Sequence, residues 1–160
     1  MRERTKFFLV ILISFFLLIL ALYLNSLAKQ KLKILSFDSF DIVVEGRENI
    51  LNPSVFYPGQ KGYIIVNNLT GYSRDDAGKL NLVAVVSLYT EKDVLVQSQT
   101  KLLQQYSSVK EDTINKMRIT FDINPRLTPG IYKLKIMITD SNSQQSVYKD
   151  KTLLVEGKIQ

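Results

Sequence analysis

The sequence predicts an all-β protein, a two-sheet sandwich of about seven strands preceded by one transmembrane α-helix. Two patterns carry this prediction. An apolar run begins at Phe7 and continues to Leu24, with Ser14 as its only polar side chain before Tyr23. From Phe37 onward, short apolar stretches alternate with turn residues, at intervals of about 8–12 residues that are typical of β-sandwiches.

The chain is expected to divide into five regions. About 130 residues follow the apolar run, which is enough for one domain with its own hydrophobic core. The expected regions, in order, are a cytoplasmic N-terminus at 1–6, a transmembrane helix acting as a signal anchor at 7–28, a basic juxtamembrane stalk at 29–36, the sandwich at 37–156 and a C-terminal tail at 157–160.

The apolar run has the length that a membrane helix needs. As a helix, it would span roughly 27 Å, close to the ~30 Å hydrocarbon core of a bilayer. A helix also satisfies its backbone hydrogen bonds internally, as lipid requires. The lipid bilayer is therefore an expected partner. Basic side chains flank the run and would meet lipid headgroups: Arg2, Arg4, Lys6, Lys29, Lys31 and Lys33.

A cleaved signal peptide is the alternative to a retained anchor. The triplet Ser26–Ala28 has small residues at both ends and would permit cleavage before Lys29. The apolar run is longer than the roughly 7–15 residues of a signal-peptide core, and this length favours retention in the cell membrane. The basic flanks are nearly balanced in number. An extracytoplasmic domain is expected only by association, because sandwich domains are common outside the cytoplasm.

The composition excludes several kinds of active site. The 160 residues include no Cys, no His and no Trp. Without Cys there is no disulfide or thiolate, and without His the commonest general base and zinc ligand are missing. We therefore expect no enzyme activity, no cofactor, no metal and no small-molecule substrate. The net charge is +6, but basic and acidic residues are interleaved, so no nucleic-acid partner is expected.

Seven segments show the period-two alternation of β-strands. The strongest, Leu80–Tyr89, is apolar on both faces, which is typical of a central strand. Alternation slips near Asp150 and Lys151, and this slip predicts a β-bulge. The expected strands are Phe40–Val44, Gly62–Val66, Leu80–Tyr89, Val94–Thr100, Met117–Ile123, Tyr132–Thr139 and Ser146–Val155.

One stretch, LTPGIY at 127–132, resembles the closing hairpin of immunoglobulin-like and fibronectin-type-III-like domains. An alternating strand follows it, as in those domains. The resemblance implies that Tyr132 hydrogen-bonds back across a corner formed by Pro129 and Gly130. Leu134 stands where antibody domains carry their second bridging Cys. Apolar packing alone would therefore hold this core together.

The turn at Tyr57–Gln60 adds a second likeness. Pro58 fixes φ near −65° and Gly59 supplies a positive φ. This turn precedes an expected strand, and it is similar to the start of the second strand in macroglobulin-type sandwich domains. The two likenesses together cover roughly residues 37–156 and imply a fold without a particular activity.

A polar loop expected at 67–79 carries the candidate interaction surface. Tyr72 and Arg74 are residue types that are common at interface hot spots, because they combine a large contact area with directed polar ends. Two acidic residues follow them. The candidate residues of this surface are Tyr72, Arg74, Asp75 and Asp76.

The same loop holds a possible glycosylation site. Asn68 begins an N-x-Thr triplet whose middle residue is not Pro, so it is a permitted acceptor in an exported protein. Asp75 and Asp76 lack the spaced oxygen ligands of a calcium loop, and no metal is expected there.

The predicted function is that of a non-catalytic accessory or structural subunit. Its extracytoplasmic sandwich would bind other membrane or envelope proteins in a larger assembly. One alternative is a glycan or cell-wall binding module that uses the 67–79 loop. A carboxylate-dependent hydrolase is a further alternative, with the candidate acids Asp75, Asp76, Glu111 and Asp112.

Overall fold

The structure is a computed structural model that describes residues 13–22, 33–46 and 54–157. The expectations for Arg2, Arg4, Lys6, Lys29 and Lys31 therefore lie outside the described residues. The chain divides into two compact units, Met1–Lys33 and Ile34–Gln160. The second unit is the β-sandwich, and it begins close to the predicted start of the domain.

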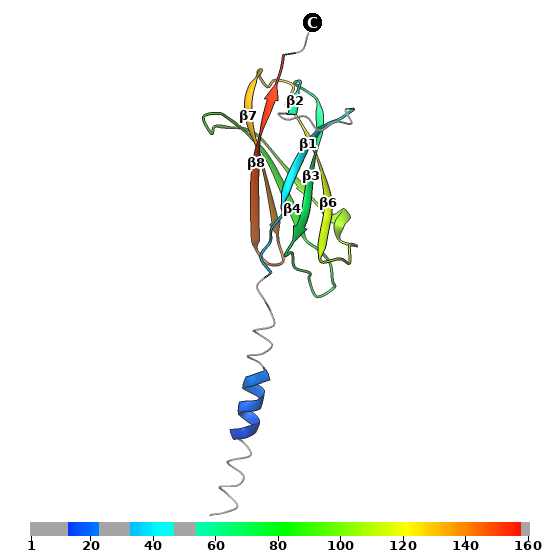
Figure 1. Ribbon diagram of the computed structural model, residues 1–160, viewed down its shortest axis with the longest axis vertical. Helices are drawn as coiled ribbons and strands as arrows, with labels where there is room; N and C mark the ends of the chain where they lie inside the picture. Colours follow the sequence, from blue (N-terminus) through cyan, green and yellow to red (C-terminus); the bar gives the residue numbers. More distant parts are fainter. Residues whose placement is uncertain (1–12, 23–32, 47–53, 158–160) are drawn as a thin grey trace, which may run out of the picture. The chain divides into compact units, whose positions relative to one another are not determined.

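The second unit contains eight β-strands among its described residues, and Figure 1 shows most of them by label. One short 3₁₀ helix, η1, interrupts them at Gln104–Tyr106. The strands are β1 (Ser39–Val44), β2 (Ser54–Phe56), β3 (Lys61–Thr70), β4 (Leu82–Thr90), β5 (Leu95–Leu102), β6 (Thr113–Asp122), β7 (Gly130–Asp140) and β8 (Gln145–Val155).

The strands form two sheets, which confirms the predicted all-β sandwich. One sheet has the order β1-β3-β6, and the other has the order β2-β8-β7-β4-β5. Neighbouring strands are antiparallel except for β2, which pairs with β8 in parallel. β4 lies between β7 and β5, so the strand that is apolar on both faces is central, as predicted.

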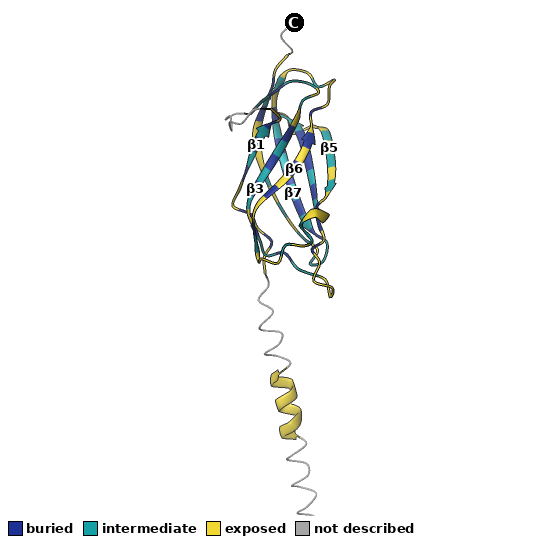
Figure 2. Cartoon of the chain, turned by 90° about the vertical axis from the view of Figure 1, so that its right-hand side faces the viewer, coloured by how far each residue is buried: buried dark blue, intermediate teal, exposed yellow. Residues whose placement is uncertain are grey.

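The core lies between the two sheets and is apolar. Along β3 and β7, buried residues alternate with half-buried ones, because successive side chains of a strand point to opposite faces; Figure 2 shows this banding. Each fully buried aliphatic side chain contributes about 1.5–3 kcal/mol relative to an exposed one. Side chains with less than 2% exposure include Phe40, Phe56, Ile64, Met117, Ile119, Leu134, Ile136 and Ile138.

The β-bulge predicted near Asp150 and Lys151 is wrong, because β8 pairs with β7 in one continuous register. The irregularity lies instead between β4 and β5, at Leu88 and Tyr89. The alternation slips in β8 because β2 covers only its last three residues, Leu153–Val155. The rest of β8 is a sheet edge, where inward-pointing charges are a common protection against further pairing.

Two lysines close this open edge. Lys149 and Lys151 share the inner face with Leu153, and they reach across to the other sheet. The Lys149 Nζ donates to the Asp38 carbonyl oxygen at 2.7 Å, and the Lys151 Nζ lies 3.3 Å from a carboxylate oxygen of Asp41. The same two ammonium groups lie 5.5 Å from the centre of the Phe37 ring and 5.2 Å from the centre of the Phe40 ring, respectively.

The sequence patterns did not predict β2, and they made the connection between β5 and β6 longer than it is. β2 has only three residues, too few to show a period. The expected strands end at Thr100 and begin again at Met117. In the structure, β5 continues to Leu102, and β6 already begins at Thr113.

The first unit contains a described helix at residues 13–22, and every residue of this helix is exposed. The predicted transmembrane helix at 7–28 extends into residues 1–12 and 23–32, which lie outside the described part. Within the part of the chain that the structure describes, no helix has both the length and the apolar character needed to cross a membrane.

Candidate functional site

The predicted corner at the start of β7 is present. The Tyr132 hydroxyl donates to the Thr128 carbonyl oxygen at 2.7 Å, and the ring of Tyr132 is buried in the core. Between these two residues, Pro129 lies in a bend and Gly130 begins β7. The hydrogen bond that the immunoglobulin-like resemblance implied is therefore made, and it serves the fold rather than a ligand.

Tyr72 and Arg74 connect the loop after β3 to the loop before β6 by hydrogen bonds. Tyr72 is only 5% exposed, and its hydroxyl donates to the Glu111 carbonyl oxygen. Arg74 donates to the Glu111 carbonyl at 3.2 Å, to the Val109 carbonyl and to the Gly78 carbonyl at 3.0 Å. Burial raises the pKa of Tyr72, and Glu111 and Asp112 add to this while Arg74 opposes it.

The loop predicted at 67–79 begins only after Thr70, because β3 continues to that residue and contains Asn68. The other candidate residues of the predicted loop are exposed. A carboxylate oxygen of Asp75 accepts the Lys79 backbone N–H at 2.8 Å and so shapes a tight turn, and Asp76 lies on that turn. Asn68 is also exposed, and its amide nitrogen donates to Asp38 at 2.7 Å. An interaction surface on this loop and a glycan on Asn68 both stay predictions.

A buried carboxylate that the sequence analysis did not single out lies beside this loop. Asp140 is 0% exposed. It accepts the Ser73 backbone N–H and the Ser143 hydroxyl at 2.7 Å each, and the Asn142 backbone N–H at 3.0 Å. These bonds occupy both carboxylate oxygens and join the β7–β8 turn to the loop that follows β3. No group of three or more metal-ligating side chains occurs among the described residues.

The outer face of the three-stranded sheet is covered by contacts among its own side chains. The Arg118 guanidinium lies 3.5 Å from the centre of the Tyr63 ring, and the Tyr63 hydroxyl donates to Glu45 at 3.0 Å. The Asn67 amide donates to Asp41 at 3.1 Å. This face therefore satisfies much of its own polar surface.

The outer face of the five-stranded sheet carries the exposed apolar side chains. Apart from Ile34 at its start, all large exposed apolar residues among the described residues of the sandwich lie on this sheet or on the turn before β5. We call four of them, on β5 and that turn, the β5 patch; Leu102 is 64% exposed. The β5 patch consists of Val94, Leu95, Val96 and Leu102, and the other two residues are Ile131 and Tyr148.

The same face has a shallow hollow of about 220 Å³. β4, β7 and β8 bring its residues together, because Tyr89 pairs with Lys133 and Lys135 pairs with Asp150. The Lys135 Nζ lies 4.0 Å from the centre of the Tyr148 ring. The residues of the hollow are Tyr89, Asp93, Lys133, Lys135, Tyr148 and Asp150.

An ion pair fixes one side of the hollow. The Lys133 Nζ donates to a carboxylate oxygen of Asp93 at 2.6 Å, and this hydrogen bond raises the pKa of Lys133. Sequence reasoning missed the hollow because its residues come from three strands and a turn. Only the strand register makes them neighbours.

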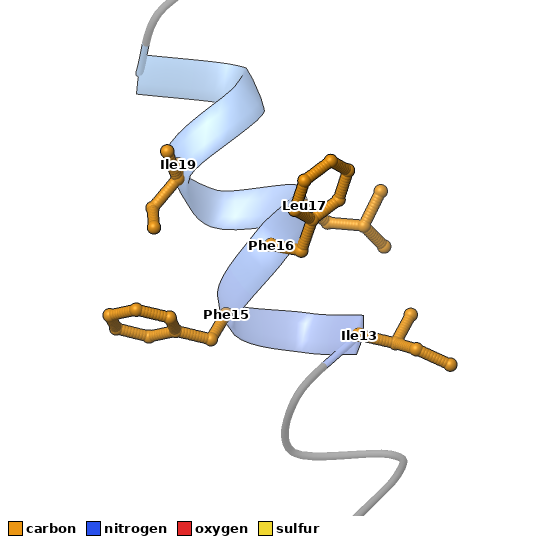
Figure 3. Close-up of a pocket in the computed structure, with 5 residues that line it drawn as sticks. All are labelled: Ile13, Phe15, Phe16, Leu17 and Ile19. Carbon is orange, nitrogen blue, oxygen red and sulfur yellow. The ribbon is translucent and has the colours of Figure 1, made fainter.

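The helix at 13–22 presents apolar side chains without enclosing a cavity. Figure 3 shows Phe15 and Ile19 on one side of the helix and Ile13 and Leu17 on the opposite side. A helix that is apolar on all sides is typical of a membrane span or of a segment buried in a larger protein.

Comparison with known proteins identifies a fold and no family. No family model and no curated protein matches the chain. A solved structure of the C-terminal domain of Wzt is similar over 78% of this chain and 75% of that chain, with 15% identity and a TM-score of 0.53. This likeness supports the β-sandwich fold alone.

Two further solved structures are less similar to this chain. A Bacteroides uniformis β-glucuronidase matches 72% of this chain but only 13% of its own length, with 12% identity and a TM-score of 0.44. The PKD domain of a human VPS10 domain-containing receptor matches 79% of this chain and 80% of that chain, with 14% identity and a TM-score of 0.37. Neither likeness is strong enough to carry a functional argument.

Proposed function

We propose that this chain is a non-catalytic, single-pass membrane protein whose sandwich binds other proteins as an accessory subunit of a membrane or cell-surface assembly. Its N-terminal apolar segment anchors it in the bilayer. The helix at 13–22 supports this proposal, because Ser14 is its only polar residue and all ten residues are exposed. The sequence stays apolar on both sides of that helix, from Phe7 to Leu24.

The observation that carries the docking proposal is the unequal distribution of exposed apolar side chains. They lie on the five-stranded sheet, and three of them, Val94–Val96, are consecutive at the start of β5, while Leu102 lies at the other end of this strand. Apolar groups that are grouped and exposed on a folded domain commonly mark a contact with another protein. Ile131 on β7 adds a further exposed apolar side chain to the same face. The partner surface is therefore expected to be apolar opposite β5.

The loop that follows β3 is a weaker candidate for the docking surface. Tyr72 contacts the core, and Arg74 already donates to three backbone carbonyls. A partner would have to break those hydrogen bonds before it could use either side chain. The same argument weakens a glycan site on this loop.

The proposal that the module is not an enzyme rests on the sequence. The absence of Cys and His leaves carboxylates, Lys, Ser and Tyr as the available acid–base groups. An extracytoplasmic position for the sandwich rests on the usual location of such domains alone, because the basic residues on the two sides of the apolar run are nearly balanced in number. Both statements are separate from the docking proposal.

The experiment is a purification from native membranes in a mild detergent, with the co-purifying proteins identified by mass spectrometry. We expect the native chain to carry a partner and a variant with Leu95→Ser and Leu102→Ser to lose it. The matched control is Lys116→Ser with Thr120→Ser, two exposed positions on the outer face of the other sheet. Purification of the native chain without a partner, or equal partner recovery from both variants, would contradict the proposal.

A further inference from the structure

We propose that the hollow between Tyr89 and Tyr148 binds one ring of a neutral polyhydroxylated ligand, a sugar unit of a glycan. This inference goes beyond the proposed function, because the hollow shares no residue with the β5 patch. It also differs from a glycan site on the loop after β3, since all six lining residues belong to the outer face of the five-stranded sheet and the turn before β5.

The size of the hollow fits a single ring. Its volume is about 220 Å³, whereas pockets for drug-sized ligands usually measure about 300–1,000 Å³. The hollow is open to solvent on the face of the sheet, so the rest of a glycan could extend out of it on either side. A ligand made of linked small rings meets both conditions, while a large fused-ring cofactor does not.

The aromatic groups offer an apolar surface of the right kind. Tyr148 is 61% exposed, and its hydroxyl-bearing ring combines an apolar face with a polar tip. Tyr89 is half-buried, two strands away on β4. A sugar ring has the same mixed character, because its C–H groups form an apolar face and its hydroxyls lie at the edge. Stacking on the face of the Tyr148 ring that Lys135 does not cover would bury apolar surface on both partners.

The charged groups favour a neutral ligand. Lys133 and Lys135 bring two positive charges, and Asp93 and Asp150 bring two negative charges. A strongly anionic ligand would be attracted by the lysines and repelled by the carboxylates, so the formal charges give no net preference. Hydroxyl groups both donate and accept. They can therefore accept hydrogen bonds from ammonium groups and donate to carboxylates in the same site.

The hollow is partly ordered before any ligand arrives. Lys133 is held by Asp93 at 2.6 Å, and Lys135 rests against the Tyr148 ring at 4.0 Å. Five of the six residues are on strands of the sheet. Side chains on strands are positioned more accurately than side chains on mobile loops, and binding then costs less conformational entropy.

The test uses the full chain, labelled with ¹⁵N and held in an amphipathic polymer that carries no sugar, because a maltoside detergent would itself present sugar rings. The probes are the methyl glycosides of glucose, galactose, mannose and N-acetylglucosamine, titrated singly and followed by NMR. We expect at least one probe to cause saturable shifts of amide signals on β7 and β8 around Lys135 and Asp150. Tyr148→Ala should weaken this binding at least about fivefold through lost stacking.

Two further variants distinguish a specific loss of sugar binding from a general loss of structure. Tyr148→Phe keeps the ring and should bind within about twofold of the native chain. Leu102→Ser removes part of the β5 patch and should leave sugar binding unchanged, so the hollow and the protein-docking surface can fail independently. Methyl glucuronide is titrated as an anionic comparison. The proposal is overturned if none of the four neutral probes causes saturable shifts, if Tyr148→Ala binds as well as the native chain, or if methyl glucuronide binds more tightly than the neutral probes.

Discussion

The two outer faces of the sandwich use similar residue types in different ways. On the three-stranded sheet, Tyr63 is held between Arg118 and Glu45, so its polar and aromatic groups are occupied within the molecule. On the five-stranded sheet, the Lys135 Nζ lies 4.0 Å from the centre of the Tyr148 ring, and Tyr148 nevertheless remains 61% exposed. A tyrosine can thus serve stability on one face and remain available for a ligand on the other.

The difference also appears at the two open sides of the sandwich. Beside β1 and β8, Lys149 and Lys151 reach across to Asp38 and Asp41. Beside β5 and β6, Gln99 donates to the Asp122 carbonyl oxygen at 2.6 Å. Both sides are closed between the sheets by long polar side chains. The apolar side chains of the β5 patch are left outside this closure, on the surface.

The largest expected effects come from buried residues beneath the two outer faces, and they should be similar for the two sheets. Ile136→Ala under the five-stranded sheet and Ile119→Ala under the three-stranded sheet should each lower the free energy of unfolding by about 2–5 kcal/mol, because both side chains are fully buried. Urea unfolding measures both losses. A loss near zero at either position would show that the sheet above it is not packed against the core.

The next prediction contrasts the two tyrosines directly. Tyr63→Ala should lower the free energy of unfolding by about 1–2 kcal/mol, because it removes the contact with Arg118 and the hydrogen bond to Glu45. Tyr148→Ala should change it by about 0.5 kcal/mol or less, since an exposed side chain loses little on truncation. Chemical denaturation of the two variants side by side checks the order. Equal losses would remove the distinction between the faces.

The β5 patch should matter for association without mattering for stability. Leu95→Ser with Leu102→Ser should leave the free energy of unfolding within about 0.5 kcal/mol per site, because both side chains are already exposed. The melting temperature of the purified variant measures this. A large destabilisation would mean that the patch supports the fold. Loss of a partner by this variant would then be explained by unfolding and not by a lost contact.

The smallest effect concerns Tyr72, which belongs to neither face. Burial raises its pKa above the ordinary value of 10.0, so the unfolded chain loses this proton first as the pH rises. Stability from Tyr72 is therefore complete below pH 10.0 and falls as the pH rises from there toward the folded-state pKa. Tyr72→Phe should flatten this alkaline slope, which urea unfolding between about pH 8 and about pH 11 would reveal. An unchanged slope would contradict the assignment.

Much of the fold could be predicted from local patterns. Leu80–Tyr89 is apolar on both faces, and the structure places this segment as the central β4. The turn at Tyr57–Gln60 is also present: the Gln60 N–H donates to the Tyr57 carbonyl at 3.0 Å, and Gly59 has a φ of +84°. These features depend on a few neighbouring residues, which is why a sequence can report them.

The rest depends on partners that are distant in the sequence. The inward lysines of β8 imitate a bulge in the sequence, because their partners lie about 110 residues away on β1 and just before it. β2 has three residues and exists only through its pairing with the end of β8. The hollow depends on the register of β4, β7 and β8. No local pattern contains that information.

The most direct test of the docking face is site-specific photo-crosslinking in native membranes. A photoreactive amino acid is placed at Leu102 on β5 in one chain and at Thr120 on β6 in another, because both positions are exposed and lie on opposite outer faces. We expect a crosslink to a distinct protein from position 102 and none from position 120. Crosslinks from position 120 alone, or equally from both positions, would contradict the assignment of the five-stranded sheet as the docking face.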